Sequence, residues 1–494
     1  MGVRVVITIR ELIGVGVVEV IEKQRREKMK KLAILSPFVL LATTALAQDS
    51  TCILQPSCSQ LGYTSAEADC GTAKVLRCPF DVSQVACLSG GSDSSGGGSG
   101  DEYNPNDPNN ELGDAIVITI NVTTAGTVKF NFGEGNIYAD CGNGIISSAG
   151  TDSTSTVSCS YTNAGDYTVT LSGDFTYYGG INSGGTTKNL IKLDKSGITK
   201  MSNICDANTV GIVPPLPISL KDGTNMLNSC SKLSSAFPKL PEGLEIGNYM
   251  FSKSSISGIA KLPSSLKSAI QMFSNLKTNF TVTGFENTQV TDGTKMFAGS
   301  NIQTVNLPST LINGTDMFAS STIKTITLPA SLEIAYRMFQ STSSLEDVKG
   351  LENTKITEAV NMFYKSTVSS ISGLPAKLTN GKCMFYNTKL ATLPTLPNGL
   401  VDASGMFFQP GGTSNISDLI GTIETSYFPS TLTKAPGMFR SNHNLKGSPN
   451  KPSNLSDYGG IFADTAVTPT SQWDSTATNV SYGNVCTSTD PNNS

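Results

Sequence analysis

The chain has 494 residues, a net charge of −4 and 15% charged residues, against about 25% in an average globular protein. No basic tract follows the N-terminal region, which excludes nucleic-acid binding driven by phosphate contacts. The single histidine, His443, excludes multi-histidine metal sites and histidine-based catalytic triads. We therefore expect neither a metal nor another cofactor.

Residues 29–47 have the pattern of a cleaved signal peptide. Lys30 and Lys31 form a basic start, an apolar stretch follows, and Ala45-Leu46-Ala47 matches a cleavage site. The stretch is shorter than the roughly 20 residues of a membrane helix. We interpret residues 1–28 as an upstream extension from a misplaced start codon. The mature chain is expected to be a bacterial protein without a transmembrane segment, secreted or displayed at the cell surface, with the periplasm as the alternative location.

Residues 48–88 form a cysteine-rich module. About 40 residues bury too little apolar surface to fold unaided, so disulfides are the expected substitute. The number of cysteines is odd, so one of them pairs elsewhere, stays free or bridges to another molecule. A zinc site is the less favoured alternative, because CxxC spacing and histidines are absent. The cysteines are Cys52, Cys58, Cys70, Cys78 and Cys87.

Residues 89–114 are rich in Gly, Ser, Asn and Pro, which predicts a flexible linker. Residues 115–175 then switch to the period-two alternation of β-strands, as in 116–122, 127–132 and 167–172. Asn143-Gly144 is a hairpin signal. This part is predicted to be a small antiparallel β-sandwich.

The same region resembles PKD-like domains. The resemblance rests on Tyr161, on Gly165-Asp-Tyr-Thr-Val169, and on Asp140-Cys-Gly-Asn-Gly144 at the place of that family's Trp-Gly-Asp-Gly stretch. Cys141 and Cys159 fall where such a core would need filling, and we expect them to form a disulfide.

A Met-Phe pair recurs along residues 190–465, with degenerate copies at both ends. Successive anchors lie 21 to 25 residues apart, except for one interval of 32. A fixed period of this size indicates units that bury their apolar faces by stacking. We predict a mainly β, leucine-rich-repeat-type solenoid of about twelve coils, closed by residues 466–494 as cap and tail, with Trp473 over the last coil. The full pairs begin at Met250, Met272, Met296, Met317, Met338, Met362, Met384, Met406 and Met438.

Two repeat patterns alternate. One is Ile302-Gln-Thr-Val-Asn-Leu-Pro-Ser-Thr-Leu311, and the other is Gly350-Leu-Glu-Asn-Thr-Lys-Ile-Thr357. Both resemble the BspA-like leucine-rich repeats of bacterial surface proteins, the second in a variant whose repeats end in Met-Phe. Within a coil, I/L-x-x-I/V-x-L predicts a short strand with one buried face, ended by proline. The Met column is interpreted as core.

Two further columns follow the anchors. Four residues after each Met stands a small polar residue in most coils, which we expect to satisfy carbonyls inside the coil. Cys205 and Cys230 share this column on adjacent coils and are candidates for a disulfide. Two residues after Met, three consecutive coils carry Tyr364, Tyr386 and Phe408. This aromatic row is the candidate ligand platform, for a sugar or a peptide, and mutual stacking is the alternative.

These features favour a secreted or surface-displayed protein that binds macromolecules over an extended solenoid face. The family resemblance implies adhesion to host, matrix or glycan components through a protein or glycan ligand. The alternative is a structural cell-envelope protein attached through its cysteine-rich module. An enzyme acting on glycans is least favoured, because no catalytic motif of the common hydrolase, metalloprotease or nucleotide-binding classes is present.

Overall fold

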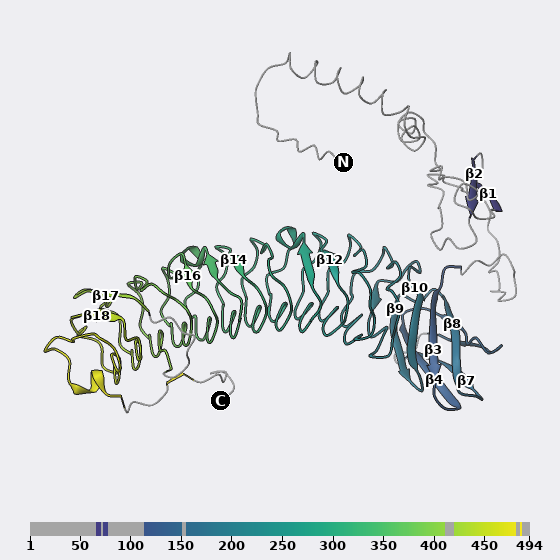
Figure 1. The fold of residues 1–494 in the computed structure, drawn as a ribbon. Helices are drawn as coiled ribbons and strands as arrows, with labels where there is room; N and C mark the ends of the chain where they lie inside the picture. The colour runs from purple at the N-terminus through teal and green to yellow at the C-terminus, as the bar shows by residue number, and fades with distance from the viewer. Residues whose placement is uncertain are drawn as a thin grey trace, which may run out of the picture. The chain divides into compact units, whose positions relative to one another are not determined.

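The computed structural model describes residues 66–70, 73–77, 113–150, 155–410, 419–480 and 485–486 (Figure 1). The chain divides into two compact units, Met1–Tyr103 and Asn104–Ser494. In the first unit, β1 (Ala66–Cys70) pairs antiparallel with β2 (Ala73–Arg77). The upstream extension, the signal peptide, the linker up to residue 112 and the side chains of the five N-terminal cysteines lie outside the described residues. Among those described, no helix has the length and apolar character needed to cross a bilayer.

The second unit begins with the predicted β-sandwich. One sheet has the order β10-β3-β8-β5-β6 and the other β11-β9-β4-β7. The sandwich continues past the expected end at residue 175, because β9 and β10 complete the two sheets. The strands are β3 (Ile116–Val122), β4 (Gly126–Gly133), β5 (Ile137–Asp140), β6 (Ile146–Ala149), β7 (Thr156–Tyr161), β8 (Gly165–Gly173), β9 (Tyr177–Ser183), β10 (Thr186–Lys192) and β11 (Lys200–Met201).

Alternate residues of the sandwich strands fill its core. Ile116, Ile118 and Ile120 of β3 are fully buried, as the period-two pattern requires. Asn143-Gly144 lies in the turn between β5 and β6, where the Asn143 side chain accepts a hydrogen bond from the Ile145 amide at 3.1 Å. The Cys141–Cys159 disulfide is present in this core, with both cysteines buried.

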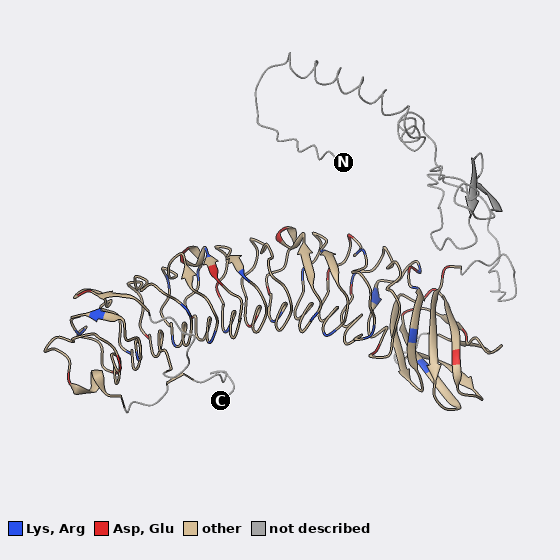
Figure 2. Cartoon of the chain, in the orientation of Figure 1, with Lys and Arg blue, Asp and Glu red and all other residues tan. Residues whose placement is uncertain are grey.

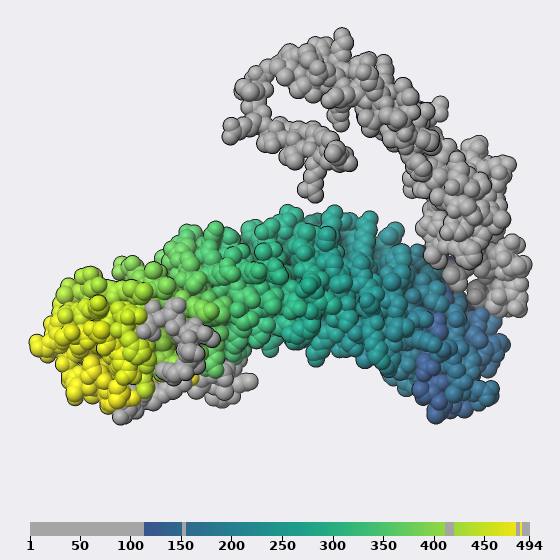
Figure 3. Space-filling model, in the orientation of Figure 1, coloured from purple at the N-terminus to yellow at the C-terminus, as the bar shows by residue number. Residues whose placement is uncertain are grey.

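The rest of the second unit is the solenoid, which confirms the mainly β, repeat-built fold. Each Met-Phe pair lies in a tight turn, and the turns of successive coils are joined by backbone hydrogen bonds. The Phe297 amide donates to the Met317 carbonyl at 2.9 Å, and the Phe318 amide donates to the Met338 carbonyl at 2.9 Å. The same bond recurs from the coil of Phe251 to that of Phe439. The coils therefore present one continuous surface (Figure 3).

From the coil of Met250 to that of Met438, the Met and Phe side chains form the core and are buried throughout. The Phe rings stack in a column, with centroids 5.4 Å apart between Phe297 and Phe318 and 5.6 Å between Phe407 and Phe439. The latter pair stays parallel within 3° although 32 residues separate Met406 from Met438. Four residues after Met, the expected polar column is confirmed, since Ser300 and Thr342 hydroxyls donate to the carbonyls of Phe297 and Phe339.

Short parallel strands line another side of the coils (Figure 1). In the second repeat pattern, a 3₁₀ turn follows the strand, after a glycine with positive φ (Gly284, 81°; Gly350, 76°). The elements are β12 (Gly258–Lys261), β13 (Phe280–Thr283), η2 (Phe285–Asn287), β14 (Thr325–Thr327), β15 (Asp347–Lys349), η3 (Leu351–Asn353), β16 (Ser370–Ile371), β17 (Gly421–Ile423), β18 (Leu445–Gly447) and η4 (Ser475–Thr478).

Both ends of the coil stack are covered. At the first coil, β11 pairs in parallel with β9, so a sheet of the sandwich continues into the solenoid. At the last coil, Trp473 packs on Phe462 with ring centroids 5.0 Å apart and donates to the Pro449 carbonyl at 2.9 Å. Trp473 thus occupies the place expected of a cap residue.

Candidate binding surfaces

The aromatic row of Tyr364, Tyr386 and Phe408 comes together on three adjacent coils but is not an open platform. The exposed fractions of the three residues are 5%, 5% and 6%. The two tyrosine rings stack face to face, 4.7 Å apart and 8° from parallel, while Phe408 meets Tyr386 edge to face. Because the ring faces are turned towards one another, they cannot stack on a sugar. The mutual stacking weighed as the alternative is what the structure contains.

Two charged groups complete the row. Lys365 Nζ lies 5.3 Å from the centroid of the Tyr364 ring, and the Arg440 guanidinium carbon lies 5.2 Å from that of Phe408. Cation–π attraction of this kind stabilises both ends of the row. Burial raises the pKa of the Tyr364 hydroxyl.

Two residues near the C-terminus, Val485 and Cys486, lie against the row. Val485 packs on it, and Cys486 forms a disulfide with Cys383, 103 residues earlier in the chain. Sequence reasoning missed this pair, although a signal was present. Six cysteines lie outside the N-terminal module, and pairing Cys141 with Cys159 and Cys205 with Cys230 leaves only these two. The Cys205–Cys230 disulfide is itself present, between adjacent coils.

The strand side of the solenoid contains an interruption. Residues 302–307 have the strand pattern, and Ile302 and Val305 are buried as expected. The prediction of a strand here is nevertheless wrong, because the segment forms no ladder. Lys324 donates to the Gln303 carbonyl at 3.0 Å, but the main-chain groups of residues 304–307 make no hydrogen bond to the described part of the chain.

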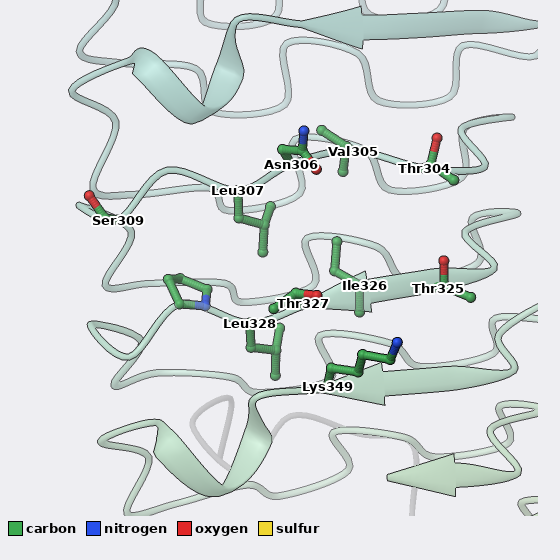
Figure 4. A pocket seen from close by; sticks show the side chains of 11 residues that line it. Thr304, Val305, Asn306, Leu307, Ser309, Thr325, Ile326, Thr327, Leu328 and Lys349 are labelled. Carbon is green, nitrogen blue, oxygen red and sulfur yellow. The ribbon is translucent and has the colours of Figure 1, made fainter. Parts of the chain in front are cut away.

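A cavity lies on each side of this unpaired segment. One has a volume of about 460 Å³ and lies between the segment and β14 (Figure 4). The other, of about 420 Å³, lies between the segment and the strands β12 and β13. Polar and apolar side chains line the first cavity in similar numbers, whereas hydroxyl and amide side chains dominate the second. The polar side chains are Thr304, Asn306, Ser309, Thr325, Thr327 and Lys349 in the first, and Asn279, Thr281, Asn301, Gln303 and Thr304 in the second.

Charged residues are scattered along the coils (Figure 2) and several pair between neighbouring coils. Arg337 binds Asp316 with two hydrogen bonds of 2.8 and 2.9 Å, and Lys267 contacts Glu245 at 2.8 Å. In the described residues, no group of three His, Cys, Asp or Glu side chains is placed to hold a metal ion. The surface therefore offers hydroxyls, amides and main-chain groups to a ligand rather than a concentrated charge.

Comparison with known proteins identifies the repeats. Residues 269–391 match the family model of the BspA type leucine-rich repeat region, in six copies. No curated protein matches the chain. A crystal structure of a leucine-rich repeat protein from Bacteroides ovatus is 13% identical over 58% of this chain and 86% of that one, with a TM-score of 0.30, too low to support further argument. Residues 269–391 are thus BspA-type leucine-rich repeats, and the same turn bonds and buried anchors continue in the coils on either side of them.

Proposed function

We propose that the protein is an exported binding protein that takes up a protein or glycan on the strand side of its solenoid. The observation that carries the proposal is the unpaired segment at residues 304–307, whose main-chain donors and acceptors lie between a cavity of mixed polar and apolar lining and a mainly polar one. Solenoids of this class provide long surfaces suited to macromolecules. The sandwich and the N-terminal module then serve to position this surface, and residues 29–47 serve as the export signal.

The size and chemistry of the cavities support binding by short parts of a large ligand. About 460 and 420 Å³ lie in the lower part of the range found for small-molecule sites. Each cavity is large enough for a side chain or a sugar ring. Unpaired main-chain N–H and C=O groups beside them can hydrogen-bond a ligand that replaces their water. Binding rather than catalysis fits this arrangement, since no concentrated set of acids, bases or nucleophiles lines the cavities.

The test uses arrays of glycans and of matrix proteins probed with the purified mature protein. Once a ligand is found, Thr327→Arg should lower its affinity at least tenfold, because the longer side chain fills the larger cavity. Thr422→Arg is the matched control, since Thr422 is exposed on β17, away from both cavities. The affinity of this variant for the ligand should stay within twofold of that of the unchanged protein. Equal losses in the two variants would contradict the proposed site. Retention of the native protein in the cell envelope, with empty arrays, would favour the structural role instead.

A further inference from the structure

The aromatic row forms a small apolar cluster of its own. Tyr364, Tyr386 and Phe408 pack with Cys383, Cys486 and Val485, separately from the continuous core of Met and Phe side chains. At the same position, two residues after Met, earlier coils carry Ser252 and Ser274, which are also buried and hydrogen-bond each other at 2.8 Å. The coil therefore does not need aromatic residues at this position in order to fold. The aromatic residues serve the segment that lies on them.

The coils are also shaped for that segment. Gly405 has a φ of 59° and lies on the coil between those of Cys383 and Arg440. A Cβ at Gly405 would collide with Cys486 Sγ and come within 2.9 Å of a Val485 methyl group. The Cys486 Sγ lies 3.7 Å from the Gly405 carbonyl oxygen. The absence of a side chain at Gly405 thus lets the tail approach the coil backbone closely.

We propose that Tyr364, Tyr386, Phe408 and Gly405 form a docking site for a peptide with a small aliphatic residue followed by cysteine, occupied here by the chain's own Val485-Cys486. The site acts before the disulfide exists. Docking of Val485 places the Cys486 thiol beside Cys383 and so selects this pair among the eleven cysteines.

Bond formation then follows by thiol–disulfide exchange. One protein thiolate attacks an external disulfide, breaks its S–S bond and forms a mixed disulfide. The second protein thiolate then attacks the mixed disulfide, so that both sulfur atoms of the oxidant leave as thiols. The two protein thiols lose two electrons and two protons, and the oxidant's disulfide gains them. In the finished protein, the bond keeps the docking site closed by its own tail.

The site can be opened without removing any part of the chain. The double variant Val485→Asp and Cys486→Ser places a charge where the aliphatic side chain docked and leaves Cys383 as a free thiol. Hydroxyl-radical footprinting should show Tyr364, Tyr386 and Phe408 becoming several-fold more reactive. Phe385 and Phe407, which belong to the central stack, should stay protected. An unchanged row, or equal exposure of the central stack, would overturn the proposal.

Recognition is tested on the opened variant with a peptide of residues 479–488, in the presence of a small-molecule disulfide. The mixed disulfide with Cys383 should form several-fold faster than with a control peptide that has aspartate in place of valine, because the partly buried valine gains apolar contact that a charged aspartate loses. Adding Tyr364→Ser and Tyr386→Ser introduces the residue that earlier coils carry at this position. In this variant the two peptides should react with Cys383 at the same rate. Equal rates for both peptides with the row intact would show that the thiol reacts without docking.

Discussion

Two residues in most coils hold the backbone in the left-handed region, one immediately before Met and one three residues after it. Lys295, Asp316 and Arg337 occupy the first position with φ of 51–54°, and Lys253 and Asn275 occupy the second with φ of 56°. A residue with a side chain loses about 1–2 kcal/mol in this conformation. The residue types at these positions vary, so the sequence does not reveal them. The backbone bonds between successive turns hold them there.

Substitution of Lys253 by glycine should therefore stabilise the protein. We expect an increase of about 0.5–1 kcal/mol in the free energy of unfolding, since relief of the left-handed strain exceeds the entropy that glycine adds to the unfolded chain. The coil at Met296 already has Gly299 at this position, with a φ of 67°. Lys261→Gly, in β12, is the control and should destabilise by a similar amount. Urea denaturation measures both, and stabilisation by both would contradict the argument.

Tyr178 in β9 is a second residue that destabilises the fold, because its polar hydroxyl group is buried. Its side chain is fully buried, its hydroxyl has no hydrogen-bond partner among the described residues, and burial raises its pKa. An unsatisfied buried hydroxyl destabilises by about 1–3 kcal/mol. Tyr178→Phe should raise the free energy of unfolding by about 1 kcal/mol, measured by denaturation followed by circular dichroism. Tyr138→Phe, at an exposed tyrosine, should leave it unchanged.

At the scale of the elements, the buried positions of a strand could be predicted, because the sequence of a single repeat determines them. The I/L-x-x-I/V-x-L pattern predicts the buried residues of β14 correctly, and it predicts those of residues 302–307 as well. The pairing of the latter was not predictable, because it depends on the path of the neighbouring coil. For the same reason the unpaired segment, and with it the candidate site, could not be found from the pattern.

The C-terminal cap contains an element whose stability depends on pH. Asp474 begins η4, and hydrogen bonds from the Thr476 side chain, the Tyr458 hydroxyl and the Thr476 amide lower its pKa below the ordinary value of 3.8. These bonds therefore stabilise the cap above about pH 4, and the stabilisation is lost as the pH falls through the lowered pKa. Trp473 is the only tryptophan of the chain.

Fluorescence of Trp473 should report this loss directly. Between pH 5 and pH 2, we expect the emission to shift to longer wavelength as the indole leaves Phe462. In Asp474→Asn the shift should become smaller, because the titrating group is gone. A shift of the same size and midpoint in this variant would assign the transition to other carboxyl groups.

At the scale of the whole molecule, the recurrence of Met-Phe was enough to predict a stack of coils, because each coil repeats the same contacts with its neighbours. The tail was not predictable in the same way. Val485 and Cys486 occur once, and they contact coils about a hundred residues away. Such contacts leave no periodic signal, and only the count of cysteines points to them.

The Cys383–Cys486 bond should hold the last coils together during unfolding. A loop of about 100 residues corresponds to about 4.7 kcal/mol in the chain-entropy model. Replacing both cysteines by serine should lower the guanidinium midpoint followed by Trp473 fluorescence, since Trp473 lies inside the closed loop. Replacing Cys141 and Cys159 by serine should leave that midpoint nearly unchanged, because the sandwich lies at the other end of the stack and repeat arrays unfold in local steps. An equal effect of the two pairs would indicate that the unit unfolds as a whole.

The parallel rings of Phe407 and Phe439 carry a consequence for how such a protein changes over time. Their stacking is maintained although the intervening coil is the longest in the array. Extra residues can therefore enter a coil between its turn and its strand without disturbing the stacked rings on either side. In the course of evolution such segments can change in length or sequence while the column of stacked Phe rings is kept. New ligand specificities can therefore arise on an unchanged scaffold. The same segments are the natural positions for grafting a foreign epitope.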